Sequence, residues 1–418
     1  MIFYLKPTYT PPSPPFPLPI KDPWPLLGNI SPQEFMKVYW QKKPLLVRGA
    51  IPAFEITPDL QSPISAQELI NLASDELVES RCILQSPWRL KQGPQTKRSI
   101  PALSKKNWTL LVQGLEAKHP SAAAVLSWFR FIPDYRLDDL MVSLAGPGGG
   151  VGPHLDSYDV FLIQMSGRRR WQIQTNPSKG FIENLPLKIL SKFEPQEEWI
   201  LNPGDMLYLP PQVAHDGVAL DPGTQTWSVG FRAPSWRELL QETLWRLADQ
   251  LDNDISLEQL LSDPVQAASI KPASIPKRVR DELKNRFLEL PLQGQSLTDL
   301  LEFTLGEILS EPKPQIVFEP PTHPLSEGVF RKTCLSKGIT LLPQTRLQIS
   351  GDYLFCNGAL MAFLDKKSDA IESWLFFAHQ RGFQPAQCRR FLSYPSMFEP
   401  IYEAYLDGWL QLGKPLGN

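Results

Sequence analysis

The hydrophobic positions divide the 418-residue chain into a strand-rich middle with helical segments on either side. From about residue 80 to 232, short runs of β-branched and aromatic residues are separated by Gly, Pro, Asn and Asp, which is typical of strands and turns. These runs are CILQ, DDLMVSLAG, DVFLIQMSG, RRWQIQT, EEWILNPGDMLYLPP, GVALD and TWSVGFRAP. Many short strands in succession predict a β-barrel or a jelly roll.

Two short helices are predicted ahead of these strands. Residues 31–49 and 65–75 each open with a serine that is followed three residues later by a glutamate, a capping-box signature (Ser31 with Glu34, and Ser65 with Glu68). The first helix is expected to end before Pro44, after which LLVRG predicts a short buried strand. The first 25 residues are rich in proline and are expected to form an extended arm.

After Pro234 the sequence pattern changes from that of strands to that of helices. Residues 235–251 place leucines at helical spacing, which predicts an amphipathic helix with a wide apolar stripe. Such a stripe indicates either a homodimer interface or a face packed on the chain's own barrel, and the sequence leaves both open. The chain continues with short strands mixed with helices, after further helices expected at 256–262, 275–290 and 296–309.

The composition indicates a large folded protein without a strong electrostatic field. Hydrophobic residues make up 42% of the chain, the formal net charge is -2 and the pI is about 6.3, so we expect two or three domains and no direct binding to nucleic acid. No apolar run is long enough to span a membrane, and prolines interrupt the N-terminus where a signal peptide would be apolar. Scattered cysteines without CxxC spacing favour a reducing compartment, so a cytoplasmic protein is expected (Cys82, Cys334, Cys356 and Cys388).

A candidate metal site lies around two of the five histidines. His154 and Asp156 stand two apart in a predicted strand, so their side chains point to one face about 6–7 Å apart. Such a pair is commonly a hydrogen-bonded surface feature, and a metal site needs a further ligand. Only His215 among the other histidines lies on a predicted strand of the same section, and a barrel can return it to the first pair. Two histidines and one carboxylate form the facial triad of non-haem Fe(II) oxygenases, although manganese and zinc accept the same donors.

Three consecutive arginines, Arg168 to Arg170, follow the candidate ligands. They are ordinarily a solvated hairpin edge. If the ligands face inward, an arginine here can instead hold the far carboxylate of a chelating cosubstrate such as 2-oxoglutarate. The segment 147–153, PGGGVGP, lacks the lysine of a phosphate loop, and its glycines are expected to let a peptide backbone approach the metal.

The motifs HLDSYDVFLIQMSGRRRWQI, PGDMLYLPPQVAHDGVAL and WSVGFRAP resemble the Jumonji-C 2-oxoglutarate oxygenases, and specifically their ribosomal oxygenase branch of the bacterial arginine 3-hydroxylase type. The resemblance covers about residues 20–234. It implies Fe(II), 2-oxoglutarate and O2 as cofactor and cosubstrates. It also implies the catalytic metal ligands His154, Asp156 and His215.

The same resemblance implies residues for the cosubstrate and the protein substrate. Arg169 matches the residue that binds the distal carboxylate, whereas Arg168 and Arg170 alternate with it and should point elsewhere. Thr226 and Ser228 are similar to polar positions of the cosubstrate pocket. Because an arginine substrate needs acidic or aromatic partners, Tyr158 and Asp159, which follow the metal pair, are expected at the substrate. Asp138 and Asp139 of the preceding strand are further candidates, although acids at the start of a strand more often bind local backbone.

For the fold, the resemblance implies an α+β chain in four parts. They are a proline-rich arm (1–25), a Jumonji-C catalytic domain built as a double-stranded β-helix of the cupin-like jelly-roll type (26–234), a helical dimerisation region (235–310) and a winged-helix-like C-terminal domain (311–418). The partners expected are a large-subunit ribosomal protein, hydroxylated at an arginine Cβ, and a second copy of the chain.

The metal motif alone leaves other functions open. Hydroxylation of histidine or lysine and N-methyl demethylation use the same oxidant and differ in the C–H bond that is presented. A non-catalytic cupin-like binding protein is an alternative from a different class, which the complete set of ligands with Arg169 argues against.

Overall fold

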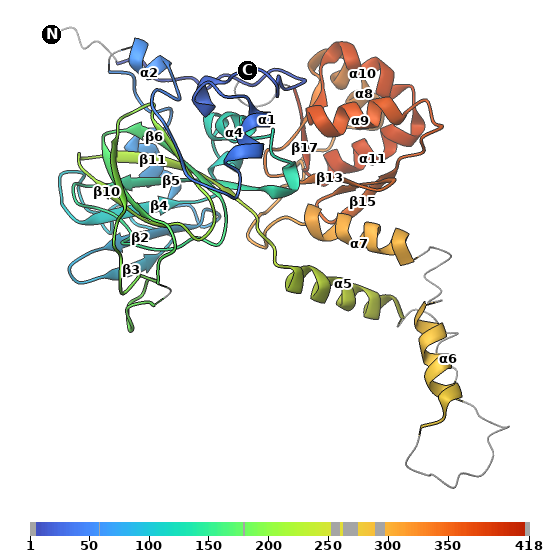
Figure 1. Ribbon diagram of the computed structural model, residues 1–418. Coiled ribbons are helices and arrows are strands. Elements are labelled where there is room, and N and C mark those ends of the chain that lie inside the picture. Colours follow the sequence, from blue (N-terminus) through green and yellow to red (C-terminus); the bar gives the residue numbers. More distant parts are fainter. Residues whose placement is uncertain are drawn as a thin grey trace.

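The computed structural model describes residues 6–57, 59–178, 180–251, 260–261, 275–288 and 297–413 of the chain (Figure 1). A β-rich part built by the first half of the chain lies beside a mainly helical part at the C-terminal end. Of the helices that connect them in sequence, α6 (Lys277–Leu288) lies well away from both parts. The architecture is therefore α+β, as the sequence predicts.

Two antiparallel sheets form the β-rich part, with strand orders β1-β9-β6-β11-β5-β4-β2-β3 and β10-β7-β8. Every predicted strand run is present, whereas β3 and β4 were not predicted. The sequence RLKQ of β3 is polar and largely exposed, so hydrophobic patterning does not mark it. The strands are β1 (Leu45–Val47), β2 (Ser80–Leu84), β3 (Arg89–Gln92), β4 (Trp108–Val112), β5 (Leu137–Ala145), β6 (Val160–Ser166), β7 (Arg169–Gln174), β8 (Glu197–Leu201), β9 (Met206–Leu209), β10 (Ala214–Ala219) and β11 (Thr224–Phe231).

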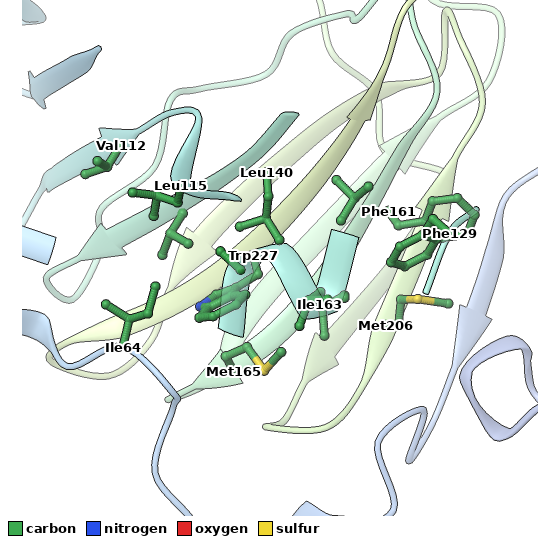
Figure 2. Packing of buried hydrophobic residues seen from close by; sticks show 14 of the residues in the cluster. Ile64, Val112, Leu115, Phe129, Leu140, Phe161, Ile163, Met165, Met206 and Trp227 are labelled. Atoms are coloured by element: carbon green, nitrogen blue, oxygen red, sulfur yellow. The ribbon is translucent and has the colours of Figure 1, made fainter. Parts of the chain in front are cut away.

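One face of the larger sheet carries the main hydrophobic core (Figure 2). Trp227 of β11 and Phe161 of β6 are completely buried on this face. Burying a side chain of this size contributes about 1.5–3 kcal/mol. The helices that supply the covering side chains are α1 (Pro32–Val38), α3 (Ala66–Leu72) and α4 (Pro120–Ser127). The other face of the sheet does not contribute to this core.

That other face turns toward the smaller sheet and mixes apolar with polar side chains. Because side chains alternate along a strand, Thr226 and Ser228 of β11 point to this interior while Trp227 and Val229 point to the core. A smaller apolar cluster fills part of the interior (Val160, Leu162, Trp171, Ile173, Leu201, Leu207, Leu209 and Val213). The remainder is polar.

The two predicted capping boxes differ in the structure. At α3 both hydrogen bonds are present, since Ser65 accepts from the backbone of Glu68 and the Glu68 side chain accepts from Ser65. At α1 the hydroxyl of Ser31 accepts from the backbone N–H of Glu34 at 3.1 Å, but the return bond is not formed. The helix start was predicted correctly there, and the box is only half present.

The helices predicted behind Pro234 are present as α5 (Trp236–Leu251), α6 (Lys277–Leu288) and α7 (Leu297–Ser310). The helix predicted at 256–262 lies outside the described residues, apart from 260 and 261. Phe303 of α7 packs on Phe355 with ring centroids 4.9 Å apart, which attaches α7 to the C-terminal part.

The C-terminal part has its own hydrophobic core, centred on buried aromatic residues such as Phe330 and Phe377. Two three-stranded sheets, β16-β12-β17 and β13-β14-β15, accompany its helices. No helix among the described residues is long and apolar enough to cross a membrane. The elements are α8 (Glu327–Lys337), β12 (Ile339–Leu341), β13 (Leu347–Ser350), β14 (Tyr353–Cys356), β15 (Ala359–Phe363), α9 (Ile371–Gln380), β16 (Gly382–Phe383), α10 (Pro385–Leu392), α11 (Pro395–Leu406) and β17 (Leu410–Leu412).

Candidate active site

The sequence predicted His154 and Asp156 on a strand, but the structure places them in an irregular segment that precedes β6. His154 instead forms an isolated antiparallel bridge with His215 of β10, in which each backbone N–H donates to the carbonyl oxygen of the other residue at 3.0 Å. The bridge sets the two imidazole rings side by side, with centroids 4.2 Å apart. Direct backbone pairing therefore joins ligands that are far apart in the sequence.

Both imidazoles are held in the same tautomer. Nδ1 of His154 lies 2.8 Å from the carbonyl oxygen of Gly152, and Nδ1 of His215 lies 3.0 Å from that of Val213. Because a carbonyl oxygen only accepts, each Nδ1 carries the proton and each Nε2 keeps its lone pair. Burial, followed by the neighbouring His154, lowers the pKa of His215 to about 4. His215 is therefore neutral near pH 7, which is the form that binds metals.

Asp156 completes a set of three donors. One ligand atom from each of His154, Asp156 and His215 lies within 4.8 Å of the others, and Nε2 of His215 is 3.7 Å from a carboxylate oxygen of Asp156. Two imidazole nitrogens and one carboxylate form a facial triad that leaves coordination positions open. The donor set therefore fits a non-haem Fe(II) ion and a chelating cosubstrate.

Arg169 is a buried cation beside these donors. It lies on β7 with 4% of its surface exposed, and its guanidinium donates to the carbonyl oxygen of Gly217 at 3.1 Å and to the hydroxyl of Ser143 at 3.3 Å. Burial lowers its pKa to about 10, so it remains charged. Within the described ranges the carboxylate of Asp216 attracts it only at a distance beyond that of an ion pair, and its Nε has no hydrogen-bond partner. A buried guanidinium in this state is suited to an incoming carboxylate.

The triad and Arg169 line one pocket of about 430 Å³ between the two sheets. Thr226 and Ser228 line the same pocket, and the Thr226 hydroxyl donates to the side chain of Gln164 at 2.8 Å. Tyr158 also lines it and is 39% exposed, which places the tyrosine ring at the opening. Most of the site residues named from the sequence thus meet in one cavity.

Asp159 is the exception, and the expectation that it contacts a substrate needs correction. Its side chain is completely buried away from the pocket. It accepts hydrogen bonds from Tyr208 at 2.6 Å and Gln41 at 3.0 Å, and it pairs with Arg136 at 3.4 Å. Asp159 therefore joins the start of β6 to the core face of the sheet and has a structural role.

The glycines of segment 147–153 also differ from expectation. A Cβ on Gly149 would collide with the carbonyl oxygen of Trp108 in β4, and one on Gly150 would lie 2.6 Å from the carbonyl oxygen of Gly217 in β10. These glycines allow close approach between parts of this chain, and they bring the segment that carries His154 against both sheets. Glycine is therefore required here for packing within the chain.

Arg168 points away from the pocket, as its alternation with Arg169 predicts. It forms an exposed ion pair with Asp221 at 3.0 Å.

Two pocket residues that were not predicted from the sequence are Ser143 and Trp171. Ser143 accepts from Arg169, and the Arg169 guanidinium lies 5.7 Å from the ring centroid of Trp171. Both have the inward parity of their strands, which is the only sequence signal that marks them.

Two facing β-sheets that enclose a His-Asp-His triad and a buried arginine define a cupin-like, 2-oxoglutarate-dependent oxygenase. Comparison with protein families agrees, because residues 124–239 match the model described as "JmjC domain".

Individual relatives narrow the class. The Escherichia coli protein named "Ribosomal protein uL16 3-hydroxylase" is 34% identical over 331 residues, which cover 78% of this chain and 84% of that protein. The "Probable ribosomal oxygenase" of Haemophilus influenzae is 36% identical over 237 residues, or 55% and 56% of the two chains. The E. coli ribosomal oxygenase YcfD, solved in complex with cobalt and 2-oxoglutarate, superposes with a TM-score of 0.73 at 30% identity over 91% of this chain and 97% of that one. This chain belongs to the JmjC ribosomal oxygenases, which are 2-oxoglutarate-dependent protein hydroxylases.

Proposed function

We propose that this protein hydroxylates the Cβ of an arginine in the large-subunit ribosomal protein uL16, with Fe(II), 2-oxoglutarate and O2. The observation that carries the proposal is the meeting of His154, Asp156, His215 and the unpaired cation Arg169 in one pocket. The substrate is taken from the name of the E. coli relative.

The roles of the pocket residues follow from their chemistry. Bound at the triad, Fe(II) supplies the oxidising chemistry that consumes 2-oxoglutarate and O2. Arg169 receives the distal carboxylate of 2-oxoglutarate in a charge-assisted, two-point contact. Thr226 and Ser228 line the wall beside it; the Ser228 hydroxyl can donate to a cosubstrate oxygen, and the Thr226 hydroxyl can do so by giving up its bond to Gln164. Because Arg169 is buried, the attraction between the two charges is stronger than it would be in water.

An arginine side chain needs an anion and an aromatic surface near the pocket opening. Tyr158 offers the ring, over which a guanidinium can lie. Asp139 of β5 offers the carboxylate, because it lines the pocket with an inward parity. Asp139 therefore takes the role that was expected of Asp159.

Mass spectrometry of a uL16-derived peptide after incubation with the protein, Fe(II) and 2-oxoglutarate tests the proposal. We expect the mass of one oxygen atom to be gained on one arginine. H154A should abolish the gain, and H323A is the matched control because His323 is exposed and remote from the triad. Hydroxylation of a histidine or lysine instead, or removal of a methyl group, would contradict the proposal and indicate one of the alternative activities.

A homodimer is proposed from the helices within 235–310. Large apolar side chains are exposed along α5 and α6, and a monomer would leave them in water (Trp236, Leu240, Leu244, Trp245, Leu283 and Phe287). Light scattering should give twice the chain mass for the wild type and the single chain mass for L244E. We also propose that residues 311–418, which follow this region in sequence, form a winged-helix-like domain.

A ribosomal substrate and four free, buried cysteines support a cytoplasmic location.

A further inference from the structure

A cluster of charged side chains joins the C-terminal part of the chain to β5 at the edge of the active-site pocket. Lys313, in the segment after α7, places Nζ 2.7 Å from the carboxylate of Asp138 and 3.6 Å from that of Asp139. Arg346 approaches Asp138 at 3.4 Å and donates to the carbonyl oxygen of Leu137 at 3.0 Å. The cluster therefore links residues that are remote in the sequence.

Asp138 and Asp139 form part of the wall between two cavities. They line the active-site pocket and also a second cavity of about 420 Å³ at the junction of the two parts of the chain. Lys313 lines only the second cavity. It thus supports the wall from behind, on the side away from the triad.

Asp139 lies where a carboxylate is difficult to keep charged. Its side chain is 13% exposed, Asp138 is its neighbour, and the buried Glu116 lies close by. Burial and then the nearby charge of Asp139 raise the pKa of Glu116 to about 8, while its carboxylate accepts from the backbone N–H of Leu140 at 3.0 Å. Burial also raises the pKa of Asp139, and Lys313 is the main group that opposes this rise.

The geometry leaves Asp139 able to bind a second cation. Lys313 makes its short contact with Asp138, and only its longer contact with Oδ1 of Asp139. Oδ2 of Asp139 accepts from the backbone N–H of Gly114 at 3.3 Å. The side chain of Gln113 is a third hydrogen-bond partner, so three groups orient the carboxylate, which still lines the pocket.

We propose that Lys313 is a positioning residue, which holds Asp139 at the pocket wall so that this carboxylate can receive the cationic side chain of the protein substrate. The inference rests on the proposed arginine substrate. If Lys313 has this role, the segment that follows α7 is a determinant of substrate specificity, although it contributes no metal ligand.

Steady-state kinetics with the uL16 peptide test this role. K313M should raise the KM for the peptide about tenfold or more with a much smaller change in kcat, because one partner of a desolvated charge cluster is removed. The KM for 2-oxoglutarate should stay at its wild-type value. K313R should restore peptide binding, and K366M is the matched control, since Lys366 forms an exposed ion pair with Asp352 at 2.7 Å.

A double-mutant cycle identifies the partner through which Lys313 acts. In a D139N background K313M should add less than about twofold to the KM for the peptide, since the two residues share one effect. K313Q replaces K313M if the methionine variant does not fold. An unchanged peptide KM in K313M and K313Q, or full additivity with D139N, would overturn the inference while leaving the proposed function intact. A wild-type protein that makes succinate and leaves the arginine peptide unmodified would overturn both.

Discussion

The active-site pocket and the cavity at the domain junction have similar volumes, about 430 and 420 Å³, and each contains a buried arginine. Burial lowers the pKa of both arginines, Arg169 and Arg381, to about 10. Arg381 donates to the carbonyl oxygens of Leu342 and Thr345 at 2.9 and 2.7 Å. Arg169 has one longer contact to a carbonyl and one to a hydroxyl, and its Nε has no partner among the described residues.

The difference separates a structural cation from a ligand-binding one. Arg381 satisfies backbone groups, and its removal takes a donor from the carbonyl oxygens of Leu342 and Thr345, of which that of Leu342 keeps the N–H of Thr345, so Arg381 belongs to the fold. Arg169 occupies a pocket with three metal donors, and an incoming carboxylate would complete its contacts. Burial alone does not distinguish the two arginines, whereas their partners do.

The largest effect is expected at the triad. H215A should lower peptide hydroxylation on the order of a thousandfold or more, because two donors no longer hold the metal in the open geometry that chemistry requires. Metal analysis of the purified variant should show less than stoichiometric iron. A variant that binds iron fully and keeps its activity would contradict the role of His215.

Replacing Arg169 should separate affinity from stability. R169M should raise the KM for 2-oxoglutarate about a hundredfold, because a desolvated charge pair is lost. The melting temperature should stay constant or rise, since a buried charge without a carboxylate partner is removed. R168A serves as the neighbouring control, and its KM for 2-oxoglutarate should be that of the wild type because Arg168 faces Asp221.

Replacing Arg381 should give the opposite result. R381M should destabilise the fold by about 1–3 kcal/mol, since buried carbonyl groups lose a donor. Activity per folded molecule should be unchanged. Denaturant unfolding followed by kinetics on the folded fraction checks both statements, and a raised KM for 2-oxoglutarate in R381M would erase the distinction between the two arginines.

The last prediction concerns the pH dependence of stability at the junction between the two parts of the chain. The folded pKa of Glu116, about 8, lies above the ordinary value of 4.5, so the unfolded chain loses this proton first as pH rises. Stability from this group is complete below pH 4.5 and falls between pH 4.5 and 8, with a limiting slope of about 1.4 kcal/mol per pH unit. E116Q should lack this slope while retaining an acceptor for Leu140. Parallel urea titrations at several pH values compare the two proteins, and identical slopes would contradict the raised pKa.

The sequence predicts most of the fold and the essential part of the site. The strand runs and the spacing of His154, Asp156 and His215 carry enough information, because alternation and hydrophobic patterning are local properties. The prediction for Asp159 was wrong because it rested on closeness in sequence to the metal pair: Tyr158 lines the pocket, whereas the Asp159 side chain is buried against Tyr208 and Gln41. Lys313 could not be found from the sequence, since only the tertiary structure brings it to Asp139.

A crystal structure with manganese(II) and 2-oxoglutarate, grown without oxygen, tests the central claim most directly. We predict one anomalous peak within bonding distance of His154, Asp156 and His215, with 2-oxoglutarate chelating it and its distal carboxylate paired with Arg169. A metal held by other residues, or a distal carboxylate that leaves Arg169 without a partner, would contradict the account.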